Sequence, residues 1–383
     1  MKNDLARYEY LSDQLQRLSN TDWIVGQQLA ASLECELGLY NEAVHDFPFD
    51  NRARVTIDPS QLPTPGGWHV ASAADTITTL AAQRRLVMVN EVHHDAHTRE
   101  LTLQLLPRLR KLGFNYFAAE ALDDKDSQLM RRGYPVAGQS SYLHEPLYGE
   151  IVREAIRLGY IIVPYESSAA STAEREQAQA ENLYRRVFAH DPHARLLVHA
   201  GYAHIDKAPG ALGGNIMPMA MHLERLSGIE PLTVDQSQLR DIGGHGRNEA
   251  YRQLTTAFSL DRPSVLVNND DGRPWSSDAH RHDVSVLLPP IDHRRRPAWI
   301  SLGGVRQSRL VNTTMCDGKT PCLVEAHYAS EGNDATAADR IALLVPDSVN
   351  SLFLYPGDYR VTASDGAGHT LSERKLHIEA TTP

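Results

Sequence analysis

The sequence of residues 86–97 is Leu86-Val87-Met88-Val89-Asn90-Glu91-Val92-His93-His94-Asp95-Ala96-His97. Its apolar first half predicts a buried β-strand, and a helical pattern begins near Thr98. A glutamate and three histidines therefore follow the carboxyl end of a strand. Ligands bind at that edge of open α/β sheets, because the loops there vary while the strands hold them rigidly. The stretch predicts an α/β sheet with a functional site at this edge.

Outward from this stretch, the pattern alternates between strand and helix. Apolar runs predict strands near residues 85–90, 115–119, 160–164 and 195–199. Helical spacing predicts helices near residues 71–82, 97–112, 146–158 and 172–190. Repeated alternation is typical of a mainly parallel sheet flanked by helices. The polar residues that end the four strands should then share one edge of the sheet.

The flanking regions follow different patterns. Residues 1–58 predict a helical hairpin that resembles one tetratricopeptide-type unit; because no second copy follows, we expect a cap on the main domain. Residues 59–295 form the predicted α/β catalytic domain. Within it, the irregular insert 122–145 is either a lid or a structural excursion. Residues 296–383 contain short alternating runs and turn signals, which predict an immunoglobulin-like β-sandwich. Such a sandwich usually serves packing; carbohydrate or protein binding is the alternative.

Composition narrows the class of protein. The chain has 383 residues, 42% of them hydrophobic, and a formal net charge of -10, which is ordinary for a soluble globular protein. We expect no nucleic-acid partner, because no basic face is evident. The run His293-Arg294-Arg295-Arg296 is expected to be a solvated linker. No apolar stretch approaches the roughly 20 residues of a transmembrane helix, and no pattern indicates an oligomeric state.

The cysteines bear on the compartment. Cys316 and Cys322 flank a turn that could bring them within disulfide reach. A disulfide would imply a periplasmic or secreted protein from which a leader has been removed; otherwise we expect a cytoplasmic protein. Cys35 lies on an apolar helical face and is expected to be a buried free thiol.

The first two predicted strands end in the strongest candidates for chemistry. Glu91, His93 and His94 come together after the first strand, and histidine and glutamate can bind metals or transfer protons near neutral pH. His97 is expected to be exposed on the following helix. Glu120 follows an apolar run, where a carboxylate is costly unless it is paired, hydrogen-bonded or bound to a metal.

The later strands add further candidates. Glu166 ends the third predicted strand. His204 lies just past Gly201, which permits a tight turn and close backbone approach. His199 lies inside a strand, so a core histidine with satisfied hydrogen bonds is expected. Tyr202 could donate to an oxyanion or simply pack, and Arg175 either points toward the same edge or is solvated.

Several familiar signatures are missing from the sequence. There is no glycine-rich phosphate loop, no Gly-x-Ser-x-Gly turn and no His-Glu-x-x-His helix. Redox chemistry with a dinucleotide and serine hydrolysis are therefore disfavoured. Histidines and carboxylates from different strands suit a divalent metal that activates water, or a metal-free histidine and glutamate pair.

Four segments together resemble a known superfamily. Asn90-Glu91-Val92-His93, Glu120, Arg175 and Gly201-Tyr202-Ala203-His204 are similar to motifs of the superfamily that contains erythromycin esterases, ChaN-like haem-uptake proteins and TIKI proteases. The resemblance covers about residues 70–290. It departs from the usual pattern at Asn90, where most members have glycine, so the backbone could approach a ligand differently there.

The resemblance implies roles for particular residues. The catalytic set it implies is Glu91, His93, Glu120, Arg175 and His204. From their positions beside these residues, we expect a substrate-binding or secondary role for His94, Glu166 and Tyr202. If a divalent metal is present, we expect His93 and His204 to hold it together with Glu120 or, alternatively, Glu91.

The superfamily divides by activity. Esterase-like members hydrolyse a macrolide ester with histidine and glutamate, TIKI-like members resemble metal-dependent peptidases, and ChaN-like members are associated with haem. We expect a hydrolase of an ester or amide (peptide) bond in a small molecule or peptide, with manganese, zinc or cobalt as possible metals. The alternative is a non-catalytic haem- or iron-binding protein, with Tyr202, His94 or His199 as axial ligand. A third reading is a pseudoenzyme that binds partners.

Overall fold

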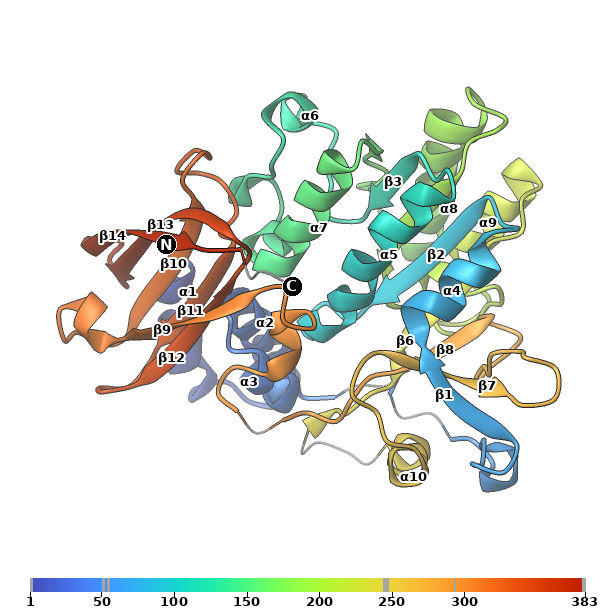
Figure 1. Ribbon diagram of the computed structural model, residues 1–383, viewed down its shortest axis with the longest axis horizontal. Coiled ribbons are helices and arrows are strands. Elements are labelled where there is room, and N and C mark those ends of the chain that lie inside the picture. The colour runs from blue at the N-terminus through green and yellow to red at the C-terminus, as the bar shows by residue number, and fades with distance from the viewer. Residues whose placement is uncertain (1–2, 50–51, 54–55, 244–247, 293, 381–383) are drawn as a thin grey trace.

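The computed structural model describes residues 3–49, 52–53, 56–243, 248–292 and 294–380. Figure 1 shows a large sheet with helices packed on it at one end of the molecule and the C-terminal strands at the other. The N-terminal helices lie beside the C-terminal strands, so the first helices and the last strands of the described chain share one region. The protein is therefore a mixed α/β protein with an added β-rich part.

The large sheet has eight strands in the order β1-β7-β8-β6-β2-β5-β3-β4. Its strands are β1 (Trp68–Ser72), β2 (Leu86–Glu91), β3 (Tyr116–Ala119), β4 (Ile161–Val163), β5 (Leu196–Gly201), β6 (Leu232–Leu239), β7 (Ser264–Asn268) and β8 (Val284–Leu287). Neighbours from β8 to β4 run parallel. Within this sheet, as far as the structure describes it, only the pairings of β7 with β1 and with β8 are antiparallel. The sheet is mixed and mostly parallel.

Helices cover both faces of this sheet. One face packs against α4 (Ala73–Ala81), α5 (Glu100–Lys111) and α7 (Pro146–Arg157). The other face packs against α8 (Thr172–Leu183), a following π-turn (Tyr184–Phe188) and α9 (Met219–Ser227). Helix α10 (Glu249–Ala257) packs against residues of β6, β7 and β8.

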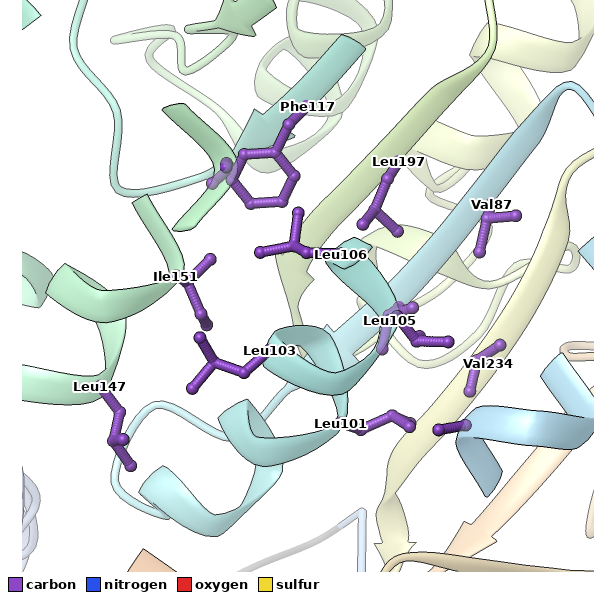
Figure 2. Close-up of a cluster of buried hydrophobic side chains, with 14 of the residues drawn as sticks. Val87, Leu101, Leu103, Leu105, Leu106, Phe117, Leu147, Ile151, Leu197 and Val234 are labelled. Atoms are coloured by element: carbon purple, nitrogen blue, oxygen red, sulfur yellow. The ribbon is translucent and has the colours of Figure 1, made fainter. Parts of the chain in front are cut away.

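The sequence of β2 explains why two faces are covered. Its side chains alternate, so Val87 and Val89 enter one core while Leu86 and Met88 enter the other. All six residues of β2 are buried, as expected for a central strand of a parallel sheet. In Figure 2 the side chains of α5 and α7 point toward those of the sheet.

The N-terminal helices are α1 (Asp4–Leu15), α2 (Asn20–Glu36) and α3 (Tyr40–Asp46). Leu5, Leu37 and Leu39 lie in the same hydrophobic core as the C-terminal strands. Cys35 and Tyr40 lie instead in the core of the large sheet. These helices therefore contact both parts of the molecule, and their division from the α/β part as a separate cap stays a prediction.

The C-terminal part consists of two antiparallel sheets. The larger has the order β11-β10-β13-β14, and the smaller pairs β12 with β9. Their strands are β9 (Gln307–Asn312), β10 (Cys322–Tyr328), β11 (Asp339–Leu343), β12 (Val349–Leu354), β13 (Gly357–Asp365) and β14 (Thr370–Ile378). The immunoglobulin-like topology and the domain boundaries remain predictions.

Short helices occupy the connections. They are η1 (Pro59–Gln61), η2 (Ala96–Arg99), α6 (Leu129–Arg132), η3 (Ala137–Gln139), η4 (Ser141–His144), η6 (Tyr202–Ile205), η8 (Ala298–Ser301) and η9 (Thr313–Cys316). Among the described helices, none has the length and apolar character needed to cross a membrane.

The cysteines behave as predicted. Cys316 and Cys322 form a disulfide bond, and Cys35 is a buried free thiol. The disulfide does not identify the compartment of the protein, which stays a prediction.

Two exposure predictions are wrong. His97 is buried, because its ring stacks on Trp299 with centroids 4.7 Å apart and its Nε2 lies 3.1 Å from Glu100 Oε2. Arg296 is buried as well, since its guanidinium lies 2.6 Å from Asp339 Oδ1. His293 lies outside the described residues.

Candidate functional site

The predicted polar residues meet at one edge of the large sheet. Strands β2, β5, β3 and β4 are parallel neighbours, so their carboxyl ends lie side by side. Glu91 is the last residue of β2, Glu120 follows β3, and Gly201 ends β5. Helix α8 starts nearby with a capping box between Ser171 and Glu174, which fixes the first turn that carries Arg175.

Glu91 holds the ring of His93. His93 Nδ1 lies 2.8 Å from Glu91 Oε1, and the Glu91 side chain is almost fully buried. Arg99 Nε donates to Glu91 Oε2 at 2.6 Å, and His199 Nε2 lies 3.2 Å from the same oxygen. Burial alone would raise the pKa of Glu91, but Arg99 and the two neighbouring histidines outweigh it and hold the pKa well below its usual range. Glu91 is therefore an ionised anchor for His93.

Arg99 was not recognised in the sequence. Its guanidinium also donates to Glu145 Oε2 at 2.9 Å, and Tyr40 donates to Glu145 Oε1 at 2.7 Å. Glu145 caps the start of α7 through the backbone N–H of Leu147. The Glu91 anchor is thus tied to the N-terminal helices through a buried chain of charges. No local sequence signal separates such a buried arginine from a solvated one.

Glu120 lies between the two histidines of the site. The backbone N–H of Gly201 donates to Glu120 Oε2 at 2.6 Å, and Arg175 Nη2 donates to Oε1 at 2.7 Å. Burial alone would raise the pKa of Glu120, but His204, His93, Arg175 and the Gly201 N–H together lower it to about 2. Glu120 is therefore ionised at neutral pH.

A second imidazole–carboxylate pair lies beside Glu120 and consists of His204, on η6, and Glu176, on α8. His204 Nδ1 lies 2.6 Å from Glu176 Oε1, while the Met219 backbone N–H donates to Glu176 Oε2 at 2.7 Å. His204 Nε2 lies 3.2 Å from Arg175 Nη1 and 3.7 Å from Glu120 Oε1. Burial disfavours the charged ring, yet Glu120 and Glu176 outweigh it and raise the pKa of His204.

Glu176 is a further residue that sequence reasoning missed. It directly follows Arg175 in a helix rich in polar residues, so its burial at 0% exposure has no local signature. The pattern marks it only as one of several glutamates on α8.

Gly201 brings His93 and Glu120 together. A Cβ at position 201 would lie 2.5 Å from His93 Nε2 and 2.9 Å from Glu120 Oε2. Any side chain there would have to displace the imidazole or the carboxylate. The glycine is therefore required by close approach of the two functional groups to the backbone.

The residue after this glycine is held in an uncommon backbone conformation. Tyr202 has a φ of 43°, which is rare for a residue with a side chain and is often found at functional sites. Its ring meets His93 edge to face at 4.9 Å, and its hydroxyl lies 3.3 Å from His94 Nδ1. Burial raises the pKa of Tyr202. Tyr202 thus links the two adjacent histidines.

His94 points into packed surroundings. Its ring stacks on Phe47 with centroids 3.6 Å apart, and the residue is 2% exposed. Burial, with help from His93 and Arg99, lowers the pKa of His94 to about 3, so its ring is neutral at physiological pH. His94 supports the site from behind Tyr202.

His199 is a core histidine, as expected. It is fully buried inside β5, and Thr102 Oγ1 lies 2.9 Å from its Nδ1. Its other nitrogen faces Glu91, so His199 helps to hold that carboxylate.

Glu166 lies at the open side of the site. Arg175 Nε donates to Glu166 Oε1 at 2.9 Å, so this arginine bridges Glu120 and Glu166. Both carboxylates border a cavity of about 530 Å³. The insert 122–145 supplies part of its wall through Asp123, Gln139 and neighbouring residues. The insert is therefore a wall of the cavity.

The three predicted metal ligands are not among the compact groups of donor atoms in the described chain. Among the described residues, the single group of three possible ligands within 4.8 Å of one another is Asp4, Glu36 and His144, none of which is a predicted ligand. Arg175 lies against both Glu120 Oε1 and His204 Nε2, where a cation would be repelled. His93, Glu120 and His204 as arranged do not fit a divalent metal, and we derive no step through one. The haem alternative stays a prediction.

Fold and site together define a mixed α/β protein with a histidine–carboxylate site at the carboxyl edge of its sheet. Neither a family model nor a curated protein matches the chain.

Solved structures give weak likenesses. The chain is similar to the type III effector HopBA1 at 16% identity and a TM-score of 0.35, over 62% of this chain and 100% of that one. A structure described as bacterial protein toxins matches at 14% identity and a TM-score of 0.33, over 56% of this chain and 47% of that one. RRSP, a MARTX toxin effector domain from Vibrio vulnificus CMCP6, matches at 12% identity and a TM-score of 0.33, over 56% of this chain and 46% of that one. TM-scores this low carry no argument about this chain.

Proposed function

We propose that the protein hydrolyses an ester or amide bond, with His93 as general base. One observation carries this proposal: His93 Nε2 and Glu120 Oε2 converge on Gly201 while Glu91 holds His93 Nδ1. A base must be oriented by one nitrogen and free to act through the other, and this arrangement supplies both.

In the proposed step, His93 Nε2 takes a proton from a water molecule as the water oxygen attacks the carbonyl carbon. The imidazolium that forms is stabilised by the ionised Glu91, which accepts from Nδ1–H. Glu120 accepts a hydrogen bond from the same water and orients it. His93 then returns the proton to the leaving alcohol or amine as the C–O or C–N bond breaks.

The developing negative charge on the carbonyl oxygen needs donors. Arg175 and His204 lie next to each other at 3.2 Å on the far side of Glu120, and the raised pKa of His204 favours its charged form. Fixed cations of this kind stabilise an oxyanion in a site with little water. They supply the electrostatic part of the proposed mechanism.

The adjoining cavity supports a polar substrate. Its lining includes Asp123, Lys125, Ser167 and Arg185, with few apolar side chains. A small polar molecule or a peptide fits this chemistry better than a large apolar one.

The test is a hydrolysis screen with activated esters of short-chain acids and a mixture of random peptides. Wild type should turn over at least one substrate. His93→Ala and Glu120→Gln should each lower the rate by about 10²–10³. His190→Ala, which changes an exposed histidine, is the matched control and should match wild type.

Two results would overturn the proposal. One is turnover that survives both substitutions in protein that remains folded. The other is stoichiometric metal in elemental analysis that is lost in His93→Ala/His204→Ala, which would replace the metal-free base by a metal-assisted step.

A further inference from the structure

The basic run that the sequence presented as a linker divides into two parts. Arg296 is buried and bound to Asp339, so it belongs to the fold. Arg294 and Arg295 are exposed, and within the described chain no ion pair or side-chain hydrogen bond engages their guanidinium groups. These two charges are therefore available to a partner.

Both arginines border a groove of about 450 Å³. Its floor is the outward face of the β9–β12 ribbon, formed by Ser308, Leu310, Val349, Ser351 and Phe353. None of the described residues that line it is acidic. The groove thus combines an apolar floor with a cationic wall.

Packing within the chain uses only part of the apolar floor, because Phe353 packs against the core of the large sheet whereas Leu310 and Val349 stay exposed. In β12 the alternate residues Leu352 and Leu354 enter the C-terminal core, which leaves Val349 on the opposite face. Leu310 is 78% exposed and Val349 is 54% exposed. Apolar side chains beside unpaired arginines are typical of protein interfaces.

We propose that this groove binds an acidic segment of a partner protein. Carboxylates of the segment would face Arg294 and Arg295, and an aliphatic or aromatic side chain would rest on Leu310 and Val349. Complementary charge would select the segment and speed its association.

Charge also argues for this partner over two others. Two copies of the chain would repel each other through their whole net charges of -10, whereas a short acidic segment meets mainly the nearby arginines, because distant charges are screened by salt. Anionic membranes are recognised by clusters of about 4–8 basic residues, and the described part of this wall offers two arginines outside an ion pair, since Arg296 is bound to Asp339. An acidic segment of a different protein fits best.

The first experiment selects from a displayed library of random peptides with the full chain as bait. Enrichment of Asp and Glu next to Leu, Ile or aromatic residues is expected. The affinity of one enriched peptide is then measured by fluorescence anisotropy for wild type and for variants.

Arg294→Glu/Arg295→Glu should weaken binding by about tenfold or more, and Leu310→Ser should also weaken it. The matched control is Arg252→Glu/Arg262→Glu, which makes the same change in net charge at exposed arginines elsewhere. The control should bind like wild type, and binding should weaken with added salt.

Several results would overturn the proposal. They are selection without acidic enrichment, equal loss of affinity in the control, a dimer in light scattering that only Arg294→Glu/Arg295→Glu abolishes, and sedimentation with phosphatidylserine vesicles that depends on the same arginines. Hydrolysis should be unchanged in all these variants. The test of peptide binding therefore does not depend on whether the protein is a hydrolase.

Discussion

Two imidazole–carboxylate pairs flank Glu120, and they differ in what holds the carboxylate. Glu91, beside His93, is neutralised by the buried cation Arg99. Glu176, beside His204, is held by a backbone N–H, and no arginine or lysine pairs with it in the described part of the chain. The same two residue types therefore stand in different electrostatic settings. The difference teaches that the partner of a carboxylate, and not the carboxylate alone, sets the electrostatic surroundings of its histidine, and the proposed mechanism uses the two histidines differently for this reason.

The largest expected effect is a loss of kcat/KM, and it should differ between substitutions of His93 and His204. His93→Ala should lower kcat/KM by about 10³, because it removes the proposed base. His204→Ala should cost about 10², because Arg175 still supports the oxyanion. Steady-state kinetics on any substrate found in the screen measure both. An equal or larger loss for His204→Ala would reverse the roles given to the two pairs.

Removing the buried cation Arg99 should destabilise the folded protein around the Glu91–His93 pair. Arg99→Met leaves two buried carboxylates without their partner and should lower the free energy of unfolding by about 3–5 kcal/mol. Denaturant titration measures the change. Adding Glu91→Gln and Glu145→Gln should recover part of the loss, because the unpaired charges are gone. A single variant as stable as wild type would show that Arg99 does not anchor this pair.

The carboxylate of Glu120, which lies between the two pairs, should make the folded protein less stable at acid pH. The pKa of Glu120 is about 2 in the folded chain against an ordinary 4.5, so folding favours its ionised form. Its contribution, about 3 kcal/mol, is fully present above pH 4.5 and is lost as the pH falls toward 2. Glu120→Gln should flatten this part of the pH dependence of unfolding, whereas Glu373→Gln at an exposed position should not. Identical slopes for Glu120→Gln and wild type would contradict the assignment.

The smallest expected effect concerns the second pair, His204 and Glu176. Glu176→Gln keeps a group that can accept from the Met219 N–H but removes the charge that helps to raise the pKa of His204. The alkaline limb of the pH profile of kcat/KM should then move to lower pH, with a rate loss of about tenfold only on that limb. Glu176→Asp should restore part of the profile. A uniform loss at every pH would indicate a merely structural role.

The edge of the sheet was predictable because it depends on local patterns. Apolar runs of strand length fixed where β2, β3 and β5 end, and parallel pairing then brought Glu91, Glu120 and Gly201 together. Each of these residues directly ends or follows a strand, so position along the chain was enough.

The supporting groups were not predictable, because they pair over long distances in the sequence. Glu145 meets Arg99 from 46 residues away, and Met219 meets Glu176 from 43 residues away. His97 is buried by Trp299, which belongs to a segment some 200 residues later. Periodicity shows which face of a helix or strand is apolar. It does not show which charged residues, distant in the sequence, will be buried against each other.

The shared core of the first helices and the last strands has a consequence for synthesis. Asn3 Nδ2 donates to the carbonyl oxygen of Asp365 at 3.0 Å, and Arg340 Nη1 lies 2.9 Å from Asp4 Oδ2. At about 5–20 residues per second, a ribosome needs about 20–70 s to reach these partners after making α1. During that time Leu5 lacks the C-terminal strands that complete its core, and only nearby residues such as Leu37 and Leu39 can cover it. Helix α1 is thus a segment that a chaperone would have to shield until the C-terminal strands have been made.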